Sequence, residues 1–323
     1  MMRRRFLAAA FGLTATGLSA GGALAQGADA TYPSQTVRIV VPFSAGSQTD
    51  ILARTIADKL GERWKRPVVV ENRPGIAGAA SVANAPPDGY TVMLTSNGHT
   101  VIKAVNPNVS FDPIKDFAGI GQVASTPSIL VVPPDGPAKT LRDLLAAAKA
   151  RPGALNYASA GLGSSTGIAA ELLRQTAGIE LTHVPYRGLP EAQTAIIRGD
   201  AALLFTFFNV GGDLIQSGKM RGLAVTGGKR LAQLPDVPTF AEAGMPEYNY
   251  DAWFGMMAPA AVPVPILAKI SQAVAQSLEA PDVKARPEPQ GVVLVSSTPE
   301  AFDTVMRSDA DRYGKLLQGK QAN

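Results

Sequence analysis

The sequence of 323 residues contains no cysteine and only two histidines, His99 and His183. Without cysteine, the chain can form no disulfide, no thiolate metal site and no lipid-modified N-terminal cysteine. Two histidines so far apart in the sequence do not make a zinc site, and the acidic residues are scattered without the spacing of a calcium loop. The sequence therefore predicts that the protein holds no metal ion.

Long apolar runs and clusters of basic residues are also missing beyond the N-terminal segment. No later stretch reaches the ~18 consecutive apolar residues of a membrane-spanning helix. The formal net charge is +4, but residues 1–25 hold three arginines and no acid, so the remainder is close to neutral. The chain thus lacks the basic footprint of a nucleic-acid-binding protein. We expect a free soluble protein that does not span a membrane and does not bind nucleic acid.

The first 25 residues have the pattern of a secretory signal. Arginines at 3–5 precede an apolar middle, and Ala-Leu-Ala at 23–25 has the small residues of a cleavage site. The arginines with the Phe-Leu that follows also resemble a twin-arginine signal, so the export route, Sec or twin-arginine, stays open. We expect cleavage after Ala25 and a periplasmic mature protein.

Strand-like and helix-like segments alternate along the rest of the chain. Strands are expected at 37–42, 67–70, 90–94, 129–132, 154–158, 181–184, 201–205, 223–225, 253–258 and 292–295. Helical spacing of apolar residues covers 49–64, 77–85, 141–150, 166–177, 190–197, 265–278 and 299–317. This alternation predicts an α/β protein with mostly parallel sheets, in which ligands bind at the carboxyl ends of strands.

The stretch VPFSAGSQTDILAR, residues 41–54, follows the first of these strands. Ser47 and Asp50 have the spacing of a capping box, which predicts that a helix begins at Ser47. Its free N–H groups and its dipole would hold an anion, and the small residues before it would let the anion approach. A tight, well-capped turn explains the stretch equally well. The candidate ligand-binding residues here are Phe43, Ser44, Ala45, Gly46, Ser47 and Asp50, with Asp50 expected to brace the helix start because its charge would repel an anion.

A second loop of this kind is SAGLGSSTG, residues 159–167, which also joins a strand to a helix. It fits the G-x-S-x-G nucleophile elbow, but that mechanism needs an acid and then a histidine. Only His183 follows, and it falls within the next predicted strand. The glycines also approach a dinucleotide fingerprint, but Glu180 begins the next strand instead of ending it. We therefore expect no catalytic residues and no cofactor. The candidate ligand-binding residues here are Ser159, Gly163, Ser164, Ser165 and Thr166.

Five further candidates follow other predicted strands. Ser96 and Asn97 come after one strand, Tyr186 and Arg187 after another, and Thr206 after a third. Arg187 is the one cation near a predicted ligand loop, although a solvated surface charge explains it equally well.

Together these motifs resemble a known family, the substrate-binding proteins of tripartite tricarboxylate transporters, or Bug-type solute receptors. The resemblance covers essentially all of the chain beyond the signal. Its landmarks are PFSAGSQTDILAR (42–54), ENRPG (71–75), PDGYT (87–91), NYASAG (156–161), HVPYRG (183–188), LPDVPTFAEAG (234–244) and WFGMMAP (253–259).

The resemblance implies the type II periplasmic binding-protein fold, in which two α/β lobes are joined by two crossing strands and the ligand lies between them. Carried over, lobe one is 26–124 with 226–323, and lobe two is 125–225. The family's usual ligands are organic acids, and its partner is a membrane permease. We therefore expect a monomeric solute receptor rather than an enzyme. The alternatives are a receptor that feeds a sensor protein and, third, an α/β hydrolase or dehydrogenase.

Three positions depart from the family's usual pattern. The first loop has Gly46-Ser47 instead of paired glycines, Gly167 stands where a histidine is common, and Thr206 stands where an aspartate is common. Phe207-Phe208 follow directly. Losing an acid and a potential cation while gaining aromatic faces favours aromatic or bulkier acids as ligands.

Overall fold

The computed structural model describes residues 32–161, 163–285 and 291–318. The chain divides into two units, Met1–Tyr32 and Pro33–Asn323, and the fold below belongs to the second. The predicted signal segment, 1–25, lies outside the described residues.

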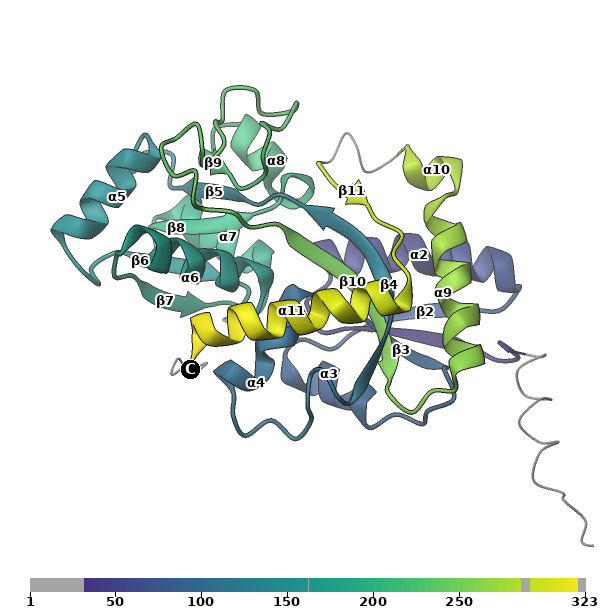
Figure 1. Cartoon of the computed structure of the whole chain (residues 1–323). Coiled ribbons are helices and arrows are strands. Elements are labelled where there is room, and N and C mark those ends of the chain that lie inside the picture. The colour runs from purple at the N-terminus through teal and green to yellow at the C-terminus, as the bar shows by residue number, and fades with distance from the viewer. Residues whose placement is uncertain (1–31, 162, 286–290, 319–323) are drawn as a thin grey trace, which may run out of the picture. The chain divides into compact units, whose positions relative to one another are not determined.

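Two mixed sheets organise the second unit (Figure 1). The six-stranded sheet has the order β11-β4-β10-β3-β1-β2 and the five-stranded sheet the order β7-β6-β8-β5-β9. The first sheet contains β1 (Val37–Val41), β2 (Val68–Asn72), β3 (Thr91–Ser96), β4 (Phe117–Thr126), β10 (Ala252–Pro259) and β11 (Val293–Leu294). The second contains β5 (Ile129–Val132), β6 (Asn156–Ser159), β7 (Thr182–Pro185), β8 (Leu203–Thr206) and β9 (Arg221–Val225).

Helices follow most of these strands. They are α2 (Gln48–Trp64), α3 (Ile76–Ala83), the 3-10 helix η1 (Asn97–Val101), α4 (Ile102–Val105), α5 (Leu141–Ala150), α6 (Ser165–Ala177), α7 (Leu189–Arg198), α8 (Phe208–Gln216), α9 (Val264–Leu278), α10 (Pro281–Lys284) and α11 (Pro299–Leu317). Their ends follow the local chemistry of the sequence. Thr140 and Asp143 form a complete capping box at α5, and Gly178 ends α6 with a left-handed φ of 59°.

The chain passes between the two sheets twice. It leaves the first sheet after Thr126 in β4 and enters the second at Ile129 in β5, and it returns between β9 and β10. The two passages are bonded to each other, because the Ser128 amide donates to the Thr226 hydroxyl at 2.8 Å and the Thr226 amide donates to the Ser128 carbonyl at 2.9 Å. The two sheets and their two crossing segments confirm the predicted α/β fold.

The prediction of mostly parallel sheets is wrong. β1 pairs in parallel with β2 and β3, but β10 lies antiparallel to both β3 and β4, and β5 lies antiparallel to both β8 and β9. The antiparallel strands are those beside the crossing segments. A chain that enters a sheet from the neighbouring one need not follow the strand–helix–strand path that makes neighbours parallel.

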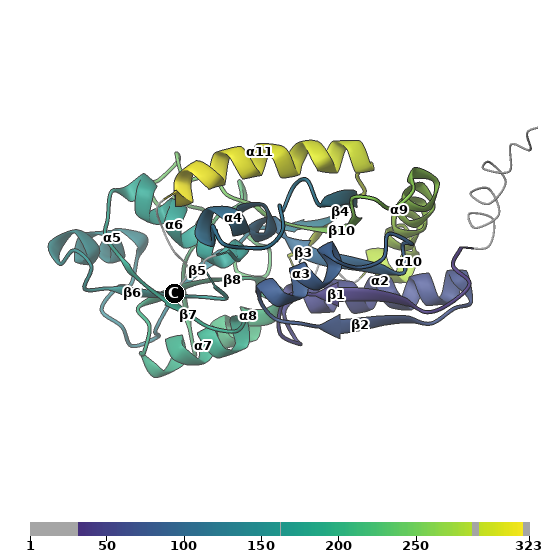
Figure 2. The same ribbon diagram turned by 90° about the horizontal axis from the view of Figure 1, so that it is seen from below.

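β4, which pairs with β10 in the middle of the first sheet, was not predicted. Its glycines interrupt the run or alternation of apolar residues that usually indicates a strand, and each of them lies against another segment of the chain. A Cβ on Gly119 would lie 2.7 Å from Asp303 Oδ1, and one on Gly121 would lie 2.9 Å from the Ser297 carbonyl oxygen. The glycines let α11 and the segment before it approach this strand, and α11 also contacts η1, α4 and α6 (Figure 2).

Candidate ligand-binding site

Ser47 caps α2, as its spacing from Asp50 predicted. Its hydroxyl accepts a hydrogen bond from the Asp50 amide at 3.3 Å, and its carbonyl accepts from the Ile51 amide at 3.0 Å. The reciprocal half of the capping box differs from the prediction, because the Asp50 carboxylate accepts from the Gly46 amide at 2.9 Å instead of from the Ser47 amide. Gly46 has a φ of 78°, a left-handed conformation that glycine adopts without strain.

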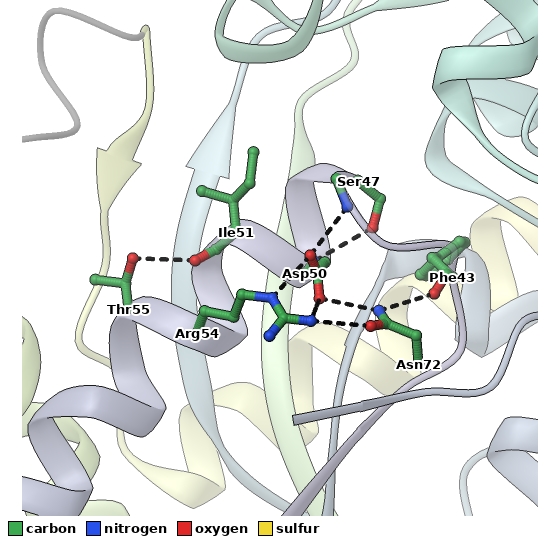
Figure 3. Close-up of polar contacts among 8 residues, drawn as sticks. Phe43, Ser47, Asp50, Ile51, Arg54, Thr55 and Asn72 are labelled. Carbon is green, nitrogen blue, oxygen red and sulfur yellow. Dashed lines mark hydrogen bonds and ion pairs between the residues drawn. The ribbon is translucent and has the colours of Figure 1, made fainter. Parts of the chain in front are cut away.

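Asp50 holds this loop from the side, as expected (Figure 3). Besides Gly46, its carboxylate accepts from the Arg54 Nε at 3.1 Å and from the Asn72 side chain at 2.9 Å, and Asn72 in turn donates to the Phe43 carbonyl at 3.1 Å. Burial alone would raise the pKa of Asp50, but the hydrogen bonds from Arg54, Gly46 and Asn72 outweigh it and hold that pKa below its usual value. Asp50 therefore fixes the loop as a charged group and is not free to meet a ligand.

Replacing Asp50 by Asn should lower the free energy of unfolding by about 1–3 kcal/mol at pH 7. An asparagine amide turns one acceptor into a donor, so one of the donors from Gly46, Arg54 or Asn72 loses its partner. The matched control is Asp58→Asn, an exposed position on the same helix, where little change is expected. Urea denaturation of the two variants measures the difference, and equal stability losses would contradict the bracing role of Asp50.

The start of α6 is built in a similar way. The Ser164 hydroxyl accepts from the Gly167 amide at 3.1 Å and donates to the Gly161 carbonyl at 2.6 Å. The Thr166 hydroxyl accepts from the Ala160 amide at 3.1 Å. These two hydroxyls shape the loop, whereas the buried Ser165 hydroxyl between them has no hydrogen-bond partner among the described residues.

A small cavity lies where the starts of several helices meet, and we call it the polar cavity. Most of its lining residues lie at helix starts. The start of α2 contributes Ser47 to Thr49, the start of α6 contributes Ser164 to Thr166, and the start of α7 contributes Gly188 and Leu189. The residues directly before α8 and η1, Phe207 and Ser96, also line it. The remaining lining residues are Phe43, Ala160 and Phe254. Its volume of about 30 Å³ is room for about two water molecules.

Three polar atoms around the polar cavity have no hydrogen-bond partner in the part of the chain that the structure describes. They are Gln48 Oε1, Ser96 Oγ and Ser165 Oγ, and the three residues are only 2%, 2% and 4% exposed. A buried polar group without a hydrogen bond costs on the order of 1–3 kcal/mol, so native proteins rarely leave several together. Their convergence from β3, α2 and α6 indicates that this cavity receives a hydrogen-bonding group.

The electrostatics of the polar cavity favour a negative group. No charged side chain belongs to the described residues that line it. Each α-helix start carries about half a positive charge together with free N–H groups. The starts of α2, α6, α7 and α8 therefore give the cavity a positive potential without a cation, as in other anion sites at helix N-termini.

One side of the polar cavity is aromatic. Phe207 and Phe254 pack edge to face with ring centroids 5.7 Å apart, and both side chains are buried. Phe43 adds a half-buried ring from the loop before α2. Phe208 faces elsewhere, since its ring fills the space beside Gly212. Only the first residue of the Phe207-Phe208 pair therefore lies at the cavity.

A second and larger cavity of about 390 Å³ shares Phe43 and Ala160 with the polar cavity. We call it the apolar cavity, because most of its wall is hydrophobic. Its lining residues include Pro42, Pro74, Ile76, Ile102 and Val105, with Gly163, Tyr186, Arg187 and His99. Burial lowers the pKa of His99 to about 4, so this side chain is neutral at pH 7.

Loops that belong to the two sheets touch beside these cavities. A Cβ on Gly98 would lie 1.9 Å from the Gly163 carbonyl oxygen, and one on Gly188 would lie 2.1 Å from the Ser44 hydroxyl. The Tyr250 hydroxyl accepts from the Asn97 amide group at 3.0 Å and donates to the Ser165 carbonyl at 2.7 Å. These contacts fix the spacing between the start of η1 and the start of α6.

The structure divides the predicted site residues into three groups. Phe43, Ser47, Ser96, Ser164, Ser165 and Thr166 line the polar cavity, whereas Phe43, Gly163, Tyr186 and Arg187 line the apolar one. Seven others line neither cavity and support the loops or the sheet behind them: Ser44, Ala45, Gly46, Asp50, Asn97, Ser159 and Thr206.

Two of these supporting residues have partners of their own. The Thr206 hydroxyl accepts from Gln193 at 2.9 Å. Ser159 is bonded to His183 at 2.7 Å, and the His183 ring stacks on Tyr157. His183 is thus a bonded strand residue, as expected, and the histidine that a nucleophile elbow needs is paired with Ser159 rather than with Ser165.

The sequence did not single out Gln48, Thr49, Gly188, Leu189 or Phe254. Gln48 and Thr49 directly follow the cap residue Ser47, and Pro190 marks the first turn of α7, so their places at helix starts were open to prediction. Phe254 carries no such signal, because it is one apolar residue within a wholly buried strand.

A metal site and a membrane-spanning helix are both absent from residues 32–161, 163–285 and 291–318. Within these ranges, no group of three or more histidine, aspartate or glutamate residues is placed to hold a metal ion. In the same ranges, no helix combines the length and the apolarity required to span a bilayer.

Comparison with known proteins identifies the family. Residues 52–321 match the tripartite tricarboxylate transporter family receptor. A Pseudomonas sp. (strain P51) protein from the tcbD-tcbE intergenic region is 36% identical over 319 residues, which cover 98% of this chain and 94% of the relative.

Two solved structures share the fold. The periplasmic binding protein BugD has a TM-score of 0.82 at 29% identity, and Rpa4515 of R. palustris, solved with adipate, has 0.82 at 32% identity. Each comparison covers 88% of this chain and 97% of the other. These findings confirm the predicted type II periplasmic binding-protein fold and place the protein among receptors rather than enzymes. The chain belongs to the family of tripartite tricarboxylate transporter receptors, as its motifs predicted.

Proposed function

We propose that the protein is a periplasmic receptor that binds the carboxylate of a small organic acid in the polar cavity. One observation carries the proposal: among the described residues, the oxygens of Gln48, Ser96 and Ser165 have no partner and converge where four α-helices begin, and none of the described lining residues is charged. The Ser96 and Ser165 hydroxyls can donate to a carboxylate, and the free N–H groups can complete its shell. The adipate bound to the R. palustris relative supports an acid as ligand.

The remaining parts of the function extend this proposal. The bound receptor delivers its acid to a tripartite tricarboxylate-type permease, after export directed by residues 1–25. Lobe one comprises 26–124 with 226–323, and lobe two comprises 125–225, so that both lobes contribute to the polar cavity. Phe43, Phe207 and Phe254 favour an acid with an aromatic or other apolar part.

The proposal is tested with acids and their own neutral amides. At 1 mM, an acid that binds with a dissociation constant of about 1 μM should stabilise the fold by about 4 kcal/mol. That is a rise in melting temperature of several degrees or more, at ~2–4 °C per kcal/mol. Thermal unfolding should be measured with adipate, malate and terephthalate, each beside its amide of the same shape. Equal shifts with acid and amide, or shifts only with neutral sugars, would refute an anion site.

A further inference from the structure

Two buried tyrosines, Tyr248 and Tyr250, lie on the segment by which the chain returns from the second sheet to β10. Each donates the hydrogen of its hydroxyl to a carbonyl oxygen of α6. Tyr248 donates to Ala169 at 2.8 Å, and Tyr250 donates to Ser165 at 2.7 Å. Ser165 and Ala169 are about one helical turn apart, so the two tyrosines hold this segment against the first turns of α6.

The two tyrosines differ in what surrounds them. The Tyr248 ring stacks on Phe205 of β8, with ring centroids 6.1 Å apart, so it packs against the second sheet. The Tyr250 ring contacts Tyr313 of α11 edge to face at 6.0 Å, and its hydroxyl accepts a hydrogen bond from the Asn97 amide group at 3.0 Å. Asn97 begins η1, which directly follows β3 of the first sheet. In the described part of the chain, only Tyr250 of this pair joins loops of both sheets through its hydroxyl.

The two partners of the Tyr250 hydroxyl belong to two walls of the polar cavity. Asn97 directly follows the lining residue Ser96, and the bonded carbonyl belongs to Ser165, which itself lines the cavity. Tyr250 is 1% exposed and Asn97 is 0% exposed, so water cannot replace either hydrogen bond while these walls stay together. Burial raises the pKa of Tyr250 well above its usual value, so its hydroxyl keeps the hydrogen that it donates.

A ligand that enters or leaves the polar cavity must disturb these bonds. The cavity has a volume of only about 30 Å³, and Ser96 and Ser165 in its walls are 2% and 4% exposed. A bound carboxylate can therefore leave only when the starts of η1 and α6 separate. That separation breaks one of the two bonds of the Tyr250 hydroxyl. An arriving ligand, in contrast, meets walls that are still apart, before both bonds have formed.

We propose that Tyr250 is a positioning residue for ligand binding, whose hydroxyl latches the start of η1 to the start of α6 and thereby slows the release of the bound acid. Because the latch forms after the acid has entered, its loss should speed release and leave the rate of entry unchanged. The inference rests on the proposed function, because it needs an acid in the polar cavity. It goes beyond that function, since Tyr250 lines neither cavity and acts through Asn97 and Ser165.

The test separates the rate of release from the rate of entry. Tyr250→Phe and its matched control Tyr248→Phe each remove one buried hydroxyl that donates to α6. The probe is whichever of adipate, malate and terephthalate stabilises the native protein most. Calorimetric titration measures its dissociation constant, and a chase of the radiolabelled acid with excess unlabelled acid measures its release rate. The rate of entry is the ratio of the release rate to the dissociation constant.

Tyr250→Phe should release the acid about tenfold faster and bind it about tenfold more weakly, which corresponds to about 1.4 kcal/mol. Its rate of entry should stay within twofold of the native value. Tyr248→Phe should lower the melting temperature about as much, because it also loses a buried hydrogen bond, but it should change release and affinity less than twofold.

A second variant tests whether Tyr250 acts through its partner. Asn97→Leu keeps nearly the shape of the side chain but cannot donate to the Tyr250 hydroxyl. It should also speed release, and combining it with Tyr250→Phe should speed release less than twofold beyond Tyr250→Phe alone.

Each other outcome has one meaning. If the two tyrosine variants speed release equally, or if Tyr250→Phe releases the acid at the native rate, the latch is overturned while the acid-binding function stands. Effects of Asn97→Leu and Tyr250→Phe that multiply in the double variant overturn it as well. Should Tyr250→Phe not fold, release at the native rate from Asn97→Leu has the same meaning. If the native protein binds none of the three acids, the proposed function fails and this inference fails with it.

Discussion

A Ser165→Asp variant is expected to unfold at a higher temperature than the native protein and to bind organic acids at least a hundredfold more weakly. Ser165 is the first residue of α6, its side chain is 4% exposed, and its hydroxyl has no hydrogen-bond partner within residues 32–161, 163–285 and 291–318. A carboxylate at this position accepts hydrogen bonds from the free N–H groups of the helix start. Its interaction with the helix dipole adds about 0.3–2 kcal/mol to the free energy of unfolding. The protein would then carry its own anion in the polar cavity.

That same carboxylate repels an acid ligand. Two unit charges 4 Å apart at the effective dielectric constant of a partly buried site interact by about 4 kcal/mol, which corresponds to roughly a thousandfold in affinity. Calorimetric titration with the acid that binds the native protein best, and thermal unfolding without ligand, measure the two effects separately.

Two controls separate charge from shape. Ser165→Asn has nearly the same shape without the charge, so it takes up the same space in the polar cavity and should bind the acid more tightly than Ser165→Asp does. Val264→Asp places an acid at the first position of α9, where the side chain is 76% exposed and lines neither cavity, so it should leave ligand affinity unchanged. If Ser165→Asp and Ser165→Asn bind the acid equally well, the carboxylate of the ligand does not lie in the polar cavity.

Local chemistry made much of this site predictable. Ser47 was predicted as a cap residue and caps α2 in the structure, because a side-chain oxygen three residues before a backbone amide has few other ways to bond. Ser164, predicted only as a ligand-binding residue, caps α6 in the same way. Helical spacing also predicted helices at 141–150 and 299–317, which the structure shows as α5 and α11 with the cap residues Thr140 and Thr298. Short-range hydrogen bonds can be inferred from spacing alone.

Non-local packing was less accessible. β4 was not predicted because its glycines weaken the strand pattern. They are needed to let α11 pack on this strand, and α11 is far away in the sequence. Thr206 was predicted to bind ligand, but its hydroxyl is hydrogen-bonded to Gln193, and the spacing of residues in the sequence does not reveal this partner. Phe207 and Phe208 are equivalent in the sequence, yet one lines the polar cavity and the other packs on Gly212. The separation of the candidates into two cavities likewise depends on where the loops of the two sheets meet.

A Gly98→Ala variant is expected to bind its acid roughly ten- to a hundredfold more weakly while it remains folded. The added Cβ would lie 1.9 Å from the Gly163 carbonyl oxygen and 2.8 Å from the Ser164 Cα. These are backbone atoms that cannot rotate away, so the start of η1 and the loop before α6 must separate by about 1.5 Å to reach ordinary contact. Ser96 and Ser165, which lie on the two sides of this contact, move apart by a similar amount.

The loss of affinity follows from hydrogen-bond geometry. A hydrogen bond of about 2.9 Å that is lengthened by about 1.5 Å is broken, and a hydrogen bond to a charged group contributes about 1.5–3 kcal/mol. Calorimetric titration measures the affinity, and circular dichroism checks the fold. The matched control is Gly228→Ala, because a Cβ there meets no atom within 4 Å and its φ is not left-handed. If a folded Gly98→Ala protein binds the acid as tightly as Gly228→Ala does, the close contact of Gly98 with Gly163 is not part of the ligand-bound arrangement, and the acid does not bridge Ser96 and Ser165.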